Sequence, residues 1–167
     1  LGYEARILTA ELAGEAAEVG RNLAAQARQL QREAGRPLCL LAGGETTVTV
    51  RGPGLGGRNL ELALAFAAEV AGEAGIALLS AGTDGTDGPT DAAGAVVNGE
   101  TAIRARERGL APEAYLERND SYRFFERTGD LFVTGPTGTN VMDVQVMLVQ
   151  PSPPRPSGVR VSEGSPP

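Results

Sequence analysis

The stretch Ile76-Ala-Leu-Leu-Ser-Ala-Gly-Thr-Asp-Gly-Thr-Asp-Gly-Pro-Thr-Asp91 joins two kinds of sequence that belong to different parts of a fold. Its first six residues are apolar or small, as in a strand that is buried on both faces. The ten residues from Gly82 onward hold three Asp, three Gly, three Thr and one Pro, which predicts a loop. Open α/β folds bind ligands where a strand ends and its loop begins. The stretch therefore predicts an α/β fold with a candidate site in this loop.

On either side of this stretch, helical and extended patterns alternate along the chain. We expect strands over residues 3–9, 38–42, 47–51, 76–81, 131–133 and 141–149, a short apolar segment over 93–97, and helices over 14–34, 58–74 and 98–108, with short ones near 112 and 121. The period-two alternation over 47–51 and the closely spaced last strands favour a mixed sheet. The predicted fold is a single α/β domain, a mixed β-sheet flanked by helices.

Composition excludes several classes of function. The chain carries 21 acidic and 15 basic side chains, all of the latter Arg, and has a net charge of −6, so a nucleic-acid partner is not expected. No run of eighteen apolar residues predicts a membrane span. The single Cys39 lies in an apolar run and suggests a cytoplasmic origin. The chain begins without Met or a secretory leader, so we expect a domain-length piece of a longer protein.

A glycine-rich loop, Gly52-Pro-Gly-Leu-Gly-Gly57, separates the alternating strand from the next helix. Its G-x-G-x-x-G pattern matches a dinucleotide-binding loop, but the preceding strand is polar on one face and no acidic residue ends a second strand about 20 positions on. The free N–H groups of such a helix start suit a phosphate or a carboxylate. Arg58 in the first turn is unfavourable for the helix dipole, so we expect it to have another task, or else to be an ordinary surface Arg.

Two further loops offer polar groups. The spacing of Asp84, Asp87 and Asp91 does not match an EF-hand, but one or two of these carboxylates could hold Mg²⁺ together with substrate phosphates, or simply cap turns. The loop Gly135-Pro-Thr-Gly-Thr-Asn140 could bind an anion or form a plain turn, and it is not a Walker A loop because no Lys follows.

Four motifs taken together resemble one known family. They are Leu41-Ala-Gly-Gly-Glu-Thr-Thr-Val-Thr-Val50, Gly56-Gly-Arg-Asn-Leu-Glu61, Ser80 to Asp91, and Thr134-Gly-Pro-Thr-Gly-Thr-Asn-Val-Met-Asp143. In order and spacing, over about residues 36–149, they resemble the carboxy-terminal domain of the MOFRL-family class II glycerate 2-kinases. The resemblance implies ATP-dependent phosphorylation of the 2-hydroxyl of D-glycerate, with Mg²⁺. It also implies that residues 1–35 lead in from a larger, absent amino-terminal domain and that 36–150 form the MOFRL-like domain. Residues 151–167 contain six Pro and four Ser with almost nothing apolar, a composition that predicts a disordered tail.

The resemblance also implies which residues act. Arg58 and Asp84 would be catalytic, and Asp84 and Asp87 would hold the metal. The residues implied in substrate or phosphate binding are Glu45, Gly56, Gly57, Asn59, Glu61, Thr90, Thr137 and Asn140, and Asp143 is a supporting candidate. The family also uses a Lys of its amino-terminal domain, and this chain contains no Lys.

Two alternatives remain open: an NAD(P)H-dependent hydroxypyruvate reductase, and a noncatalytic module that binds a metabolite or a metal. A homo-oligomer is also left open. For the kinase, we expect the chain alone to fold but not to turn over D-glycerate. We further expect Arg58→Ala to lower the rate about a hundredfold with little change in stability.

Overall fold

A computed structural model of the chain describes residues 2–152, so the predicted tail from residue 153 onward lies outside the described part. The elements follow in the order β1 (Glu4–Leu12), α1 (Ala16–Glu33), β2 (Leu38–Gly44), α2 (Arg58–Glu69), β3 (Ile76–Gly82), β4 (Gly94–Asn98), α3 (Thr101–Glu107), α4 (Pro112–Leu116), α5 (Ser121–Thr128), β5 (Leu131–Phe132) and β6 (Asp143–Val149). Within these residues, no helix has the length and apolar character needed to cross a membrane.

The strands form one mixed sheet in the order β1-β2-β6-β3-β4-β5, as predicted. Strands β1 and β2 are parallel, and every other neighbouring pair is antiparallel. The last strand in sequence, β6, therefore lies in the middle of the sheet, between β2 and β3. As a result β2 and β3 run in the same direction and end at the same edge of the sheet.

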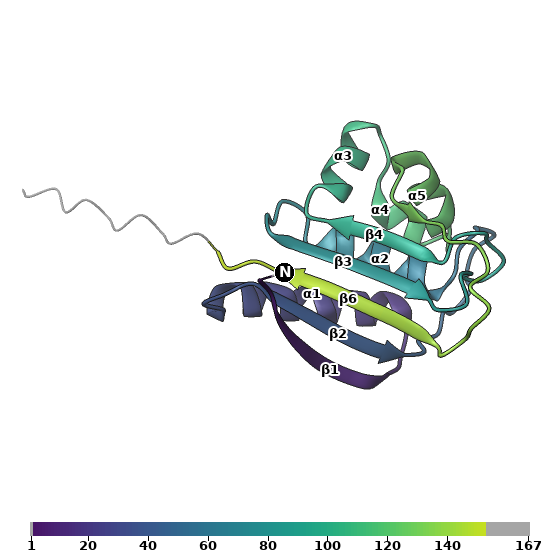
Figure 1. Cartoon of the computed structure of the whole chain (residues 1–167). Helices are drawn as coiled ribbons and strands as arrows, with labels where there is room; N and C mark the ends of the chain where they lie inside the picture. Colours follow the sequence, from purple (N-terminus) through teal and green to yellow (C-terminus); the bar gives the residue numbers. More distant parts are fainter. Residues whose placement is uncertain (1, 153–167) are drawn as a thin grey trace, which may run out of the picture.

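The helices gather on one side of the sheet, with α1 and α2 lying directly behind the strands in Figure 1. Helix α2 is the centre of the core: its residues from Asn59 to Ala67 are all buried. Helices α3, α4 and α5 pack against α2 in turn. The apolar residues that surround most of the circumference of α2 explain this position, since an all-round apolar helix is stable only when it is covered on every side.

The predicted strand over residues 47–51 is wrong. Only Thr47 makes a bridge, to Glu15, and the backbone then bonds to side chains instead of a neighbouring strand. The N–H of Thr49 donates to Glu15 Oε1 at 3.0 Å, and the N–H of Arg51 donates to Asn119 Oδ1 at 2.6 Å. These side-chain acceptors replace a strand partner, which an alternating pattern alone cannot reveal.

Two predicted helix boundaries also differ. Helix α2 ends at Glu69 rather than near Ala74, because Gly72 and Gly75 adopt positive φ angles in the turn that leads to β3. Helix α3 begins at Thr101 rather than just after Asn98, whose side chain accepts the N–H of Glu100 at 2.9 Å ahead of the helix.

Candidate functional site

A cluster of charged side chains lies at the edge of the sheet where β2 and β3 end and β6 begins. In the register of the sheet, Asp143 at the start of β6 pairs with Gly44 on one side and Gly82 on the other. Helix α2 begins at the same edge with Arg58. We call the group Arg58, Glu45, Asp143, Asp84 and Asn140 the strand-edge site.

All three nitrogen atoms of the Arg58 guanidinium contact carboxylates. Its Nε and Nη2 donate to Asp143 Oδ2 at 2.6 Å and Oδ1 at 3.0 Å, a bidentate pair. Its Nη1 lies 2.8 Å from Glu45 Oε1. The Asp143 side chain is 1% exposed, the Arg58 side chain 35% and that of Glu45 55%. The hydrogen bond with Asp143, supported by the charges of Asp143 and Glu45, raises the pKa of Arg58. The guanidinium is thus fixed on its buried side by Asp143 and partly exposed to solvent on its other side.

Asp84 lies beside this pair. A Cβ added to Gly82 would be 3.1 Å from Asp84 Oδ1 and 3.7 Å from Asp143 Oδ1, so Gly82 leaves room between the two carboxylates. Asp84 Oδ1 accepts the N–H of Thr86 at 3.0 Å, and Oδ2 accepts from Asn140 Nδ2 at 3.3 Å. The structure therefore brings Asp84 and Asn140 to the same edge as Arg58.

The loop before β6 is tied to the loop after β3. Thr137 donates its N–H to the backbone carbonyl of Asp84 at 3.1 Å and its hydroxyl to that of Thr83 at 2.6 Å. The hydroxyl of Thr83 in turn donates to the carbonyl of Met142 at 2.7 Å. Thr137 therefore supports the position of Asp84 through the backbone, and the two loops form one wall of the strand-edge site.

Asp87 occupies a different place, at the start of helix α2. Its Oδ1 accepts the N–H of Asn59 at 3.1 Å and its Oδ2 accepts that of Leu60 at 2.8 Å, so it caps the helix from a distant loop. A Cβ on Gly57 would overlap the Asp87 carboxylate, and one on Gly56 would overlap Ser121 Oγ. The N–H groups at the start of α2, which could bind a ligand anion, therefore already bind the carboxylate of Asp87. Binding of a substrate or phosphate by Gly56 and Gly57 stays a prediction.

The metal assignments also stay predictions. Both Asp87 oxygens accept hydrogen bonds from α2, which turns this carboxylate toward the helix. Across residues 2–152, no group of three or more His, Cys, Asp and Glu side chains gathers as a metal site would. Asp84 is the carboxylate of the two that faces the strand-edge site.

Asp87 has a raised pKa because it is buried. Burial raises the pKa of Asp87 to about 6, against the lowering by the N–H groups of Leu60 and Asn59. Because this pKa is higher in the folded than in the unfolded chain, Asp87 contributes stability that is gained as the pH falls through 6 and lost as it rises. Between about pH 7 and pH 5 we expect this residue to add roughly 1 kcal/mol to the free energy of unfolding.

Chemical denaturation at both pH values tests this expectation. The Asp87→Asn variant serves as the reference, because it cannot titrate while other groups titrate in both proteins. At pH 5 the free energy of unfolding of the wild type, relative to that of the variant, should be higher than at pH 7. A difference that is the same at both pH values would show that Asp87 has an ordinary pKa.

Asn59 is buried beneath the sheet edge, and Thr90 is half-buried and bonds within its own loop. Asn59 is 1% exposed, and its Oδ1 accepts from Ser80 Oγ at 2.8 Å and from Gln145 Nε2 at 3.4 Å beneath the start of α2. Thr90 donates its hydroxyl to the carbonyl of Asp87 at 2.8 Å, inside its own loop. Both residues hold the framework that positions Arg58 and Asp87, and their predicted contact with substrate is untested.

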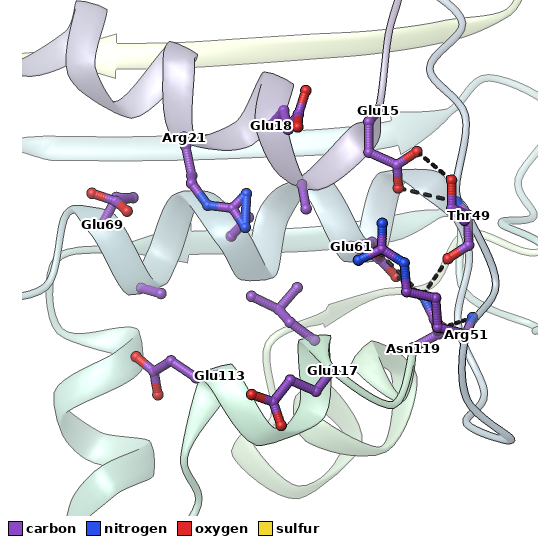
Figure 2. Close-up of a pocket in the computed structure, with 14 residues that line it drawn as sticks. Glu15, Glu18, Arg21, Thr49, Arg51, Glu61, Glu69, Glu113, Glu117 and Asn119 are labelled. Atoms are coloured by element: carbon purple, nitrogen blue, oxygen red, sulfur yellow. Dashed lines mark hydrogen bonds between the residues drawn. The ribbon is translucent and has the colours of Figure 1, made fainter.

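Glu61 faces a separate cavity of about 520 Å³ (Figure 2). Its carboxylate accepts from Asn119 Nδ2 at 3.0 and 3.3 Å, and burial raises the pKa of Glu61. The cavity shares no residue with the strand-edge site; its charged lining consists of Glu15, Glu18, Arg21, Arg51, Glu61, Glu69, Glu113 and Glu117. Sequence reasoning gave no indication of this cavity, because its glutamates come from α1, α2 and α4 and from the residues that flank α1 and α4.

Asn119 is a structural residue that is not among the candidates of the sequence analysis. It has a positive φ of 53°, and its side chain bonds to the backbone of Thr49, Arg51 and Gly52 as well as to Glu61. It thereby holds the segment that leads into the glycine-rich loop. Among residues other than Gly, Asn is one of those that most often adopt a positive φ, and this was the one indication available from the sequence.

Known proteins are similar to this chain over the segment that contains the strand-edge site. The MOFRL family matches residues 38–143. A D-glycerate 2-kinase of Thermotoga maritima is 48% identical over 151 residues, which is 89% of this chain and 36% of that protein. The crystal structure of glycerate kinase from Thermotoga maritima superimposes with a TM-score of 0.86 over the same shares of the two chains.

Other relatives differ in name. A glycerate kinase of Danio rerio is 53% identical over 121 residues, 69% of this chain and 24% of its own length. A putative hydroxypyruvate reductase of Agrobacterium vitis is 44% identical over 148 residues, 86% of this chain and 34% of its own length. The chain thus spans between a quarter and about a third of the length of these relatives. The matched segment contains Glu45, Arg58, Asp84, Asn140 and Asp143, and on this match the chain belongs to the MOFRL family.

Proposed function

We propose that this chain carries one wall of the active site of a glycerate kinase that transfers a phosphoryl group from ATP to the 2-hydroxyl of D-glycerate. The observation that supports this most is the bidentate pair between Arg58 and Asp143 beside Asp84. Phosphoryl transfer depends mainly on positioning and on neutralising charge, so a rigid guanidinium next to a carboxylate suits it. Relatives about three times as long, and a chain without Lys, support a second wall supplied by another domain.

Each residue of the strand-edge site has a role in this proposal. Asp143 holds Nε and Nη2 of Arg58, which leaves the outward Nη1 for a carboxylate or phosphate oxygen of the substrate. Glu45, which is more than half exposed, contacts Nη1 and would have to move aside for a substrate oxygen to bind there. Asp84 accepts the proton of the attacking hydroxyl or binds the metal.

A magnesium ion is compatible with the carboxylate of Asp84 if substrate phosphates supply most of its other oxygen ligands. Mg²⁺ prefers oxygen donors and is usually held by one or two carboxylates together with substrate phosphates. Asp84 offers one carboxylate, and Asn140 Oδ1 is a further oxygen nearby, although it accepts the N–H of Met142 at 3.0 Å. When bound, the ion would neutralise the charge of the phosphates. Arg58 would then orient the acceptor substrate independently of the metal.

The reductase alternative is less compatible with the start of α2. A dinucleotide places its pyrophosphate on the free N–H groups at the start of the helix that follows the glycine-rich loop. Here the N–H groups of Asn59 and Leu60 already donate to Asp87. A dinucleotide would have to displace a buried carboxylate that caps the central helix.

The function is tested with a fusion protein in which this chain replaces the segment that it matches in the Thermotoga maritima D-glycerate 2-kinase. We expect the fusion to release ADP when D-glycerate, ATP and Mg²⁺ are present, and the chain alone to release none. Oxidation of NADH with hydroxypyruvate is measured on the same samples. NADH oxidation without ADP release would favour the reductase, whereas turnover by the chain alone would contradict the need for a second domain.

A further inference from the structure

Met142 lies at the point where the pairing between β3 and β6 ends. The last pair of these two strands is Gly82 with Asp143. The next two residues, Thr83 and Met142, keep only half of a regular antiparallel exchange: the N–H of Thr83 donates to the carbonyl of Met142 at 3.0 Å. The N–H of Met142 turns away and donates to Asn140 Oδ1 at 3.0 Å. The strand pairing therefore stops at Met142, while both of its backbone polar groups stay bonded.

The turn holds Met142 in a conformation that its side chain disfavours. Its φ angle is 71°, in the left-handed region, which few residues other than Gly, Asn and Asp adopt. Packing does not impose this conformation, because the side chain is 46% exposed, so the hydrogen bonds of the backbone are what hold it. Backbone strain of this kind persists only where the surrounding structure fixes it, and it is concentrated at functional sites.

Thr83 supplies most of that fixation. Its hydroxyl donates to the same carbonyl of Met142 at 2.7 Å and accepts the N–H of Val141 at 2.8 Å. Its own carbonyl, which would accept the N–H of Met142 in a regular ladder, instead accepts the hydroxyl of Thr137 at 2.6 Å. All the polar groups of Thr83 are thus used to hold the loop before β6. We call Thr83, Asn140 and Met142 the loop clamp.

Asn140 connects the loop clamp to Asp84. Its side-chain amide accepts the N–H of Met142 through Oδ1 and donates to Asp84 Oδ2 at 3.3 Å through Nδ2. Because the amide group is planar, the direction of the Met142 N–H sets the place from which Nδ2 reaches Asp84. A change of conformation at Met142 would therefore remove a hydrogen-bond donor from the Asp84 carboxylate.

The backbone around Asp84 is fixed against the same loop. The carbonyl of Asp84 accepts the N–H of Thr137 at 3.1 Å. A Cβ added to the next residue, Gly85, would overlap the backbone carbonyl of Gly135, so the two loops are in contact there. Asp84 is thus tied to the loop before β6 through its own carbonyl and through the residues on both sides of it.

We propose that Thr83 and Met142 are positioning residues, which hold the carboxylate of Asp84 in a fixed place relative to Asp143. Asp84 directly follows Thr83 in the chain, and Asp143, which binds Arg58, directly follows Met142. The bonds between Thr83 and Met142 therefore set the spacing of the two carboxylates. Phosphoryl transfer depends on such placement, and a displacement of about 1 Å can lower a rate about a hundredfold. The effect on the rate rests on the proposed function, but the effect on the place of Asp84 does not.

Thr83→Val tests the hydroxyl of the loop clamp. Valine keeps the shape of the side chain and the backbone N–H, but it can neither donate to Met142 nor accept from Val141. In the fusion protein we expect kcat for ADP release to fall at least about tenfold, and Thr83→Ser, which keeps the hydroxyl, to restore most of it. Thr134→Val is the matched control, because Thr134 is exposed and its hydroxyl bonds within its own loop, to the carbonyl of Gly135 at 2.8 Å. Its variant should have the kcat of the wild type.

Substitutions of Met142 test the backbone conformation. Met142→Val should lower kcat about as much as Thr83→Val, because a β-branched residue is a steric outlier at a positive φ. Met142→Asn should keep most of the activity, since Asn adopts the left-handed region more readily. If the Met142 side chain instead contacted the substrate, Asn, which differs from Met in size and polarity, would be as harmful as Val. Equal losses in both variants would therefore contradict a role through the backbone.

NMR of the ¹⁵N-labelled chain observes the loop clamp without any activity. The side-chain amide protons of Asn140 report the bond to Asp84. In Thr83→Val and Met142→Val these protons should change in chemical shift and exchange faster with solvent, and the backbone amide of Asp84 should shift with them. In Thr83→Ser they should stay close to their positions in the wild type.

The Nε–H of Arg58 is the internal reference, because it reports the pair with Asp143. Its signal should be the same in the wild type and in all variants. A variant that loses this signal together with those of Asn140 has not folded at this edge. Met142→Ala, a smaller disruption of the same kind, then replaces it.

Unchanged Asn140 and Asp84 signals in both valine variants overturn the proposal, whatever the activity. Changed signals with full activity show that the loop clamp holds Asp84 without serving the reaction, which overturns its role in positioning. If the wild-type fusion protein releases no ADP, the proposed function fails, and the NMR signals still decide whether Thr83 and Met142 hold the Asp84 carboxylate.

Discussion

Replacing Arg58 by Ala is expected to lower the free energy of unfolding by about 3 kcal/mol, because Asp143 would stay charged and buried without its partner. The value is at the lower end of the range for a broken buried pair, since the guanidinium is one third exposed. This replaces the expectation from sequence that stability would hardly change. Urea denaturation of the chain measures the loss directly.

A double-mutant cycle separates the pair from other effects of the substitution. Asp143→Ala removes the buried charge, so the double variant should be more stable than the sum of the two single losses predicts, by at least about 1 kcal/mol. Glu45→Ala is the control, because a contact with a carboxylate that is 55% exposed contributes only about 0–1 kcal/mol. Additive losses at Arg58 and Asp143 would contradict the bidentate pair.

In the fusion protein, Asp84→Asn is expected to lower the rate of ADP release at least about a hundredfold, the loss typical of a removed charged group in the transition state. The amide keeps the shape of the side chain and can still accept the N–H of Thr86. Stability should therefore change by less than about 1 kcal/mol. The rate at saturating D-glycerate, and its dependence on Mg²⁺, are measured for both proteins.

Asp91→Asn provides the matched control for Asp84. Asp91 belongs to the same loop and accepts a hydrogen bond from the hydroxyl of Tyr122 at 2.8 Å, but it is exposed and is not part of the strand-edge site. Its variant should keep nearly full activity. If added Mg²⁺ restores part of the rate of Asp84→Asn, the carboxylate binds the metal; if it does not, the role as proton acceptor is favoured. A fully active Asp84→Asn variant would remove Asp84 from the site.

Most of the elements could be predicted because their causes are local. The apolar runs of β2 and β3 and the apolar circumference of α2 are visible in short windows of sequence. The loop after β3 follows from its Gly, Asp and Thr residues. Where an element depends on distant side chains, as at residues 47–51, the same local patterns gave the wrong answer.

The contacts of the site could not be predicted for a related reason. Arg58 and Asp143 are 85 residues apart, and Asp87 caps a helix that begins 29 residues before it. Periodicity and composition do not show which distant carboxylate meets which donor. Motif resemblance selected Arg58, Asp84 and Asn140, which the structure brings to one edge of the sheet, and their roles stay predictions. It did not separate the residues that surround Arg58 from those, such as Asn59 and Glu61, that point elsewhere.

The position of β6 has a consequence for how the chain is made. A ribosome delivers β2 and β3 long before residues 143–149, yet these two strands are joined only through β6. Until that segment leaves the exit tunnel, both strands keep a row of unpaired backbone groups. Nascent chains should therefore depend on chaperones or on fast release, and a stop codon shortly before residue 143 should yield insoluble protein rather than a smaller folded domain.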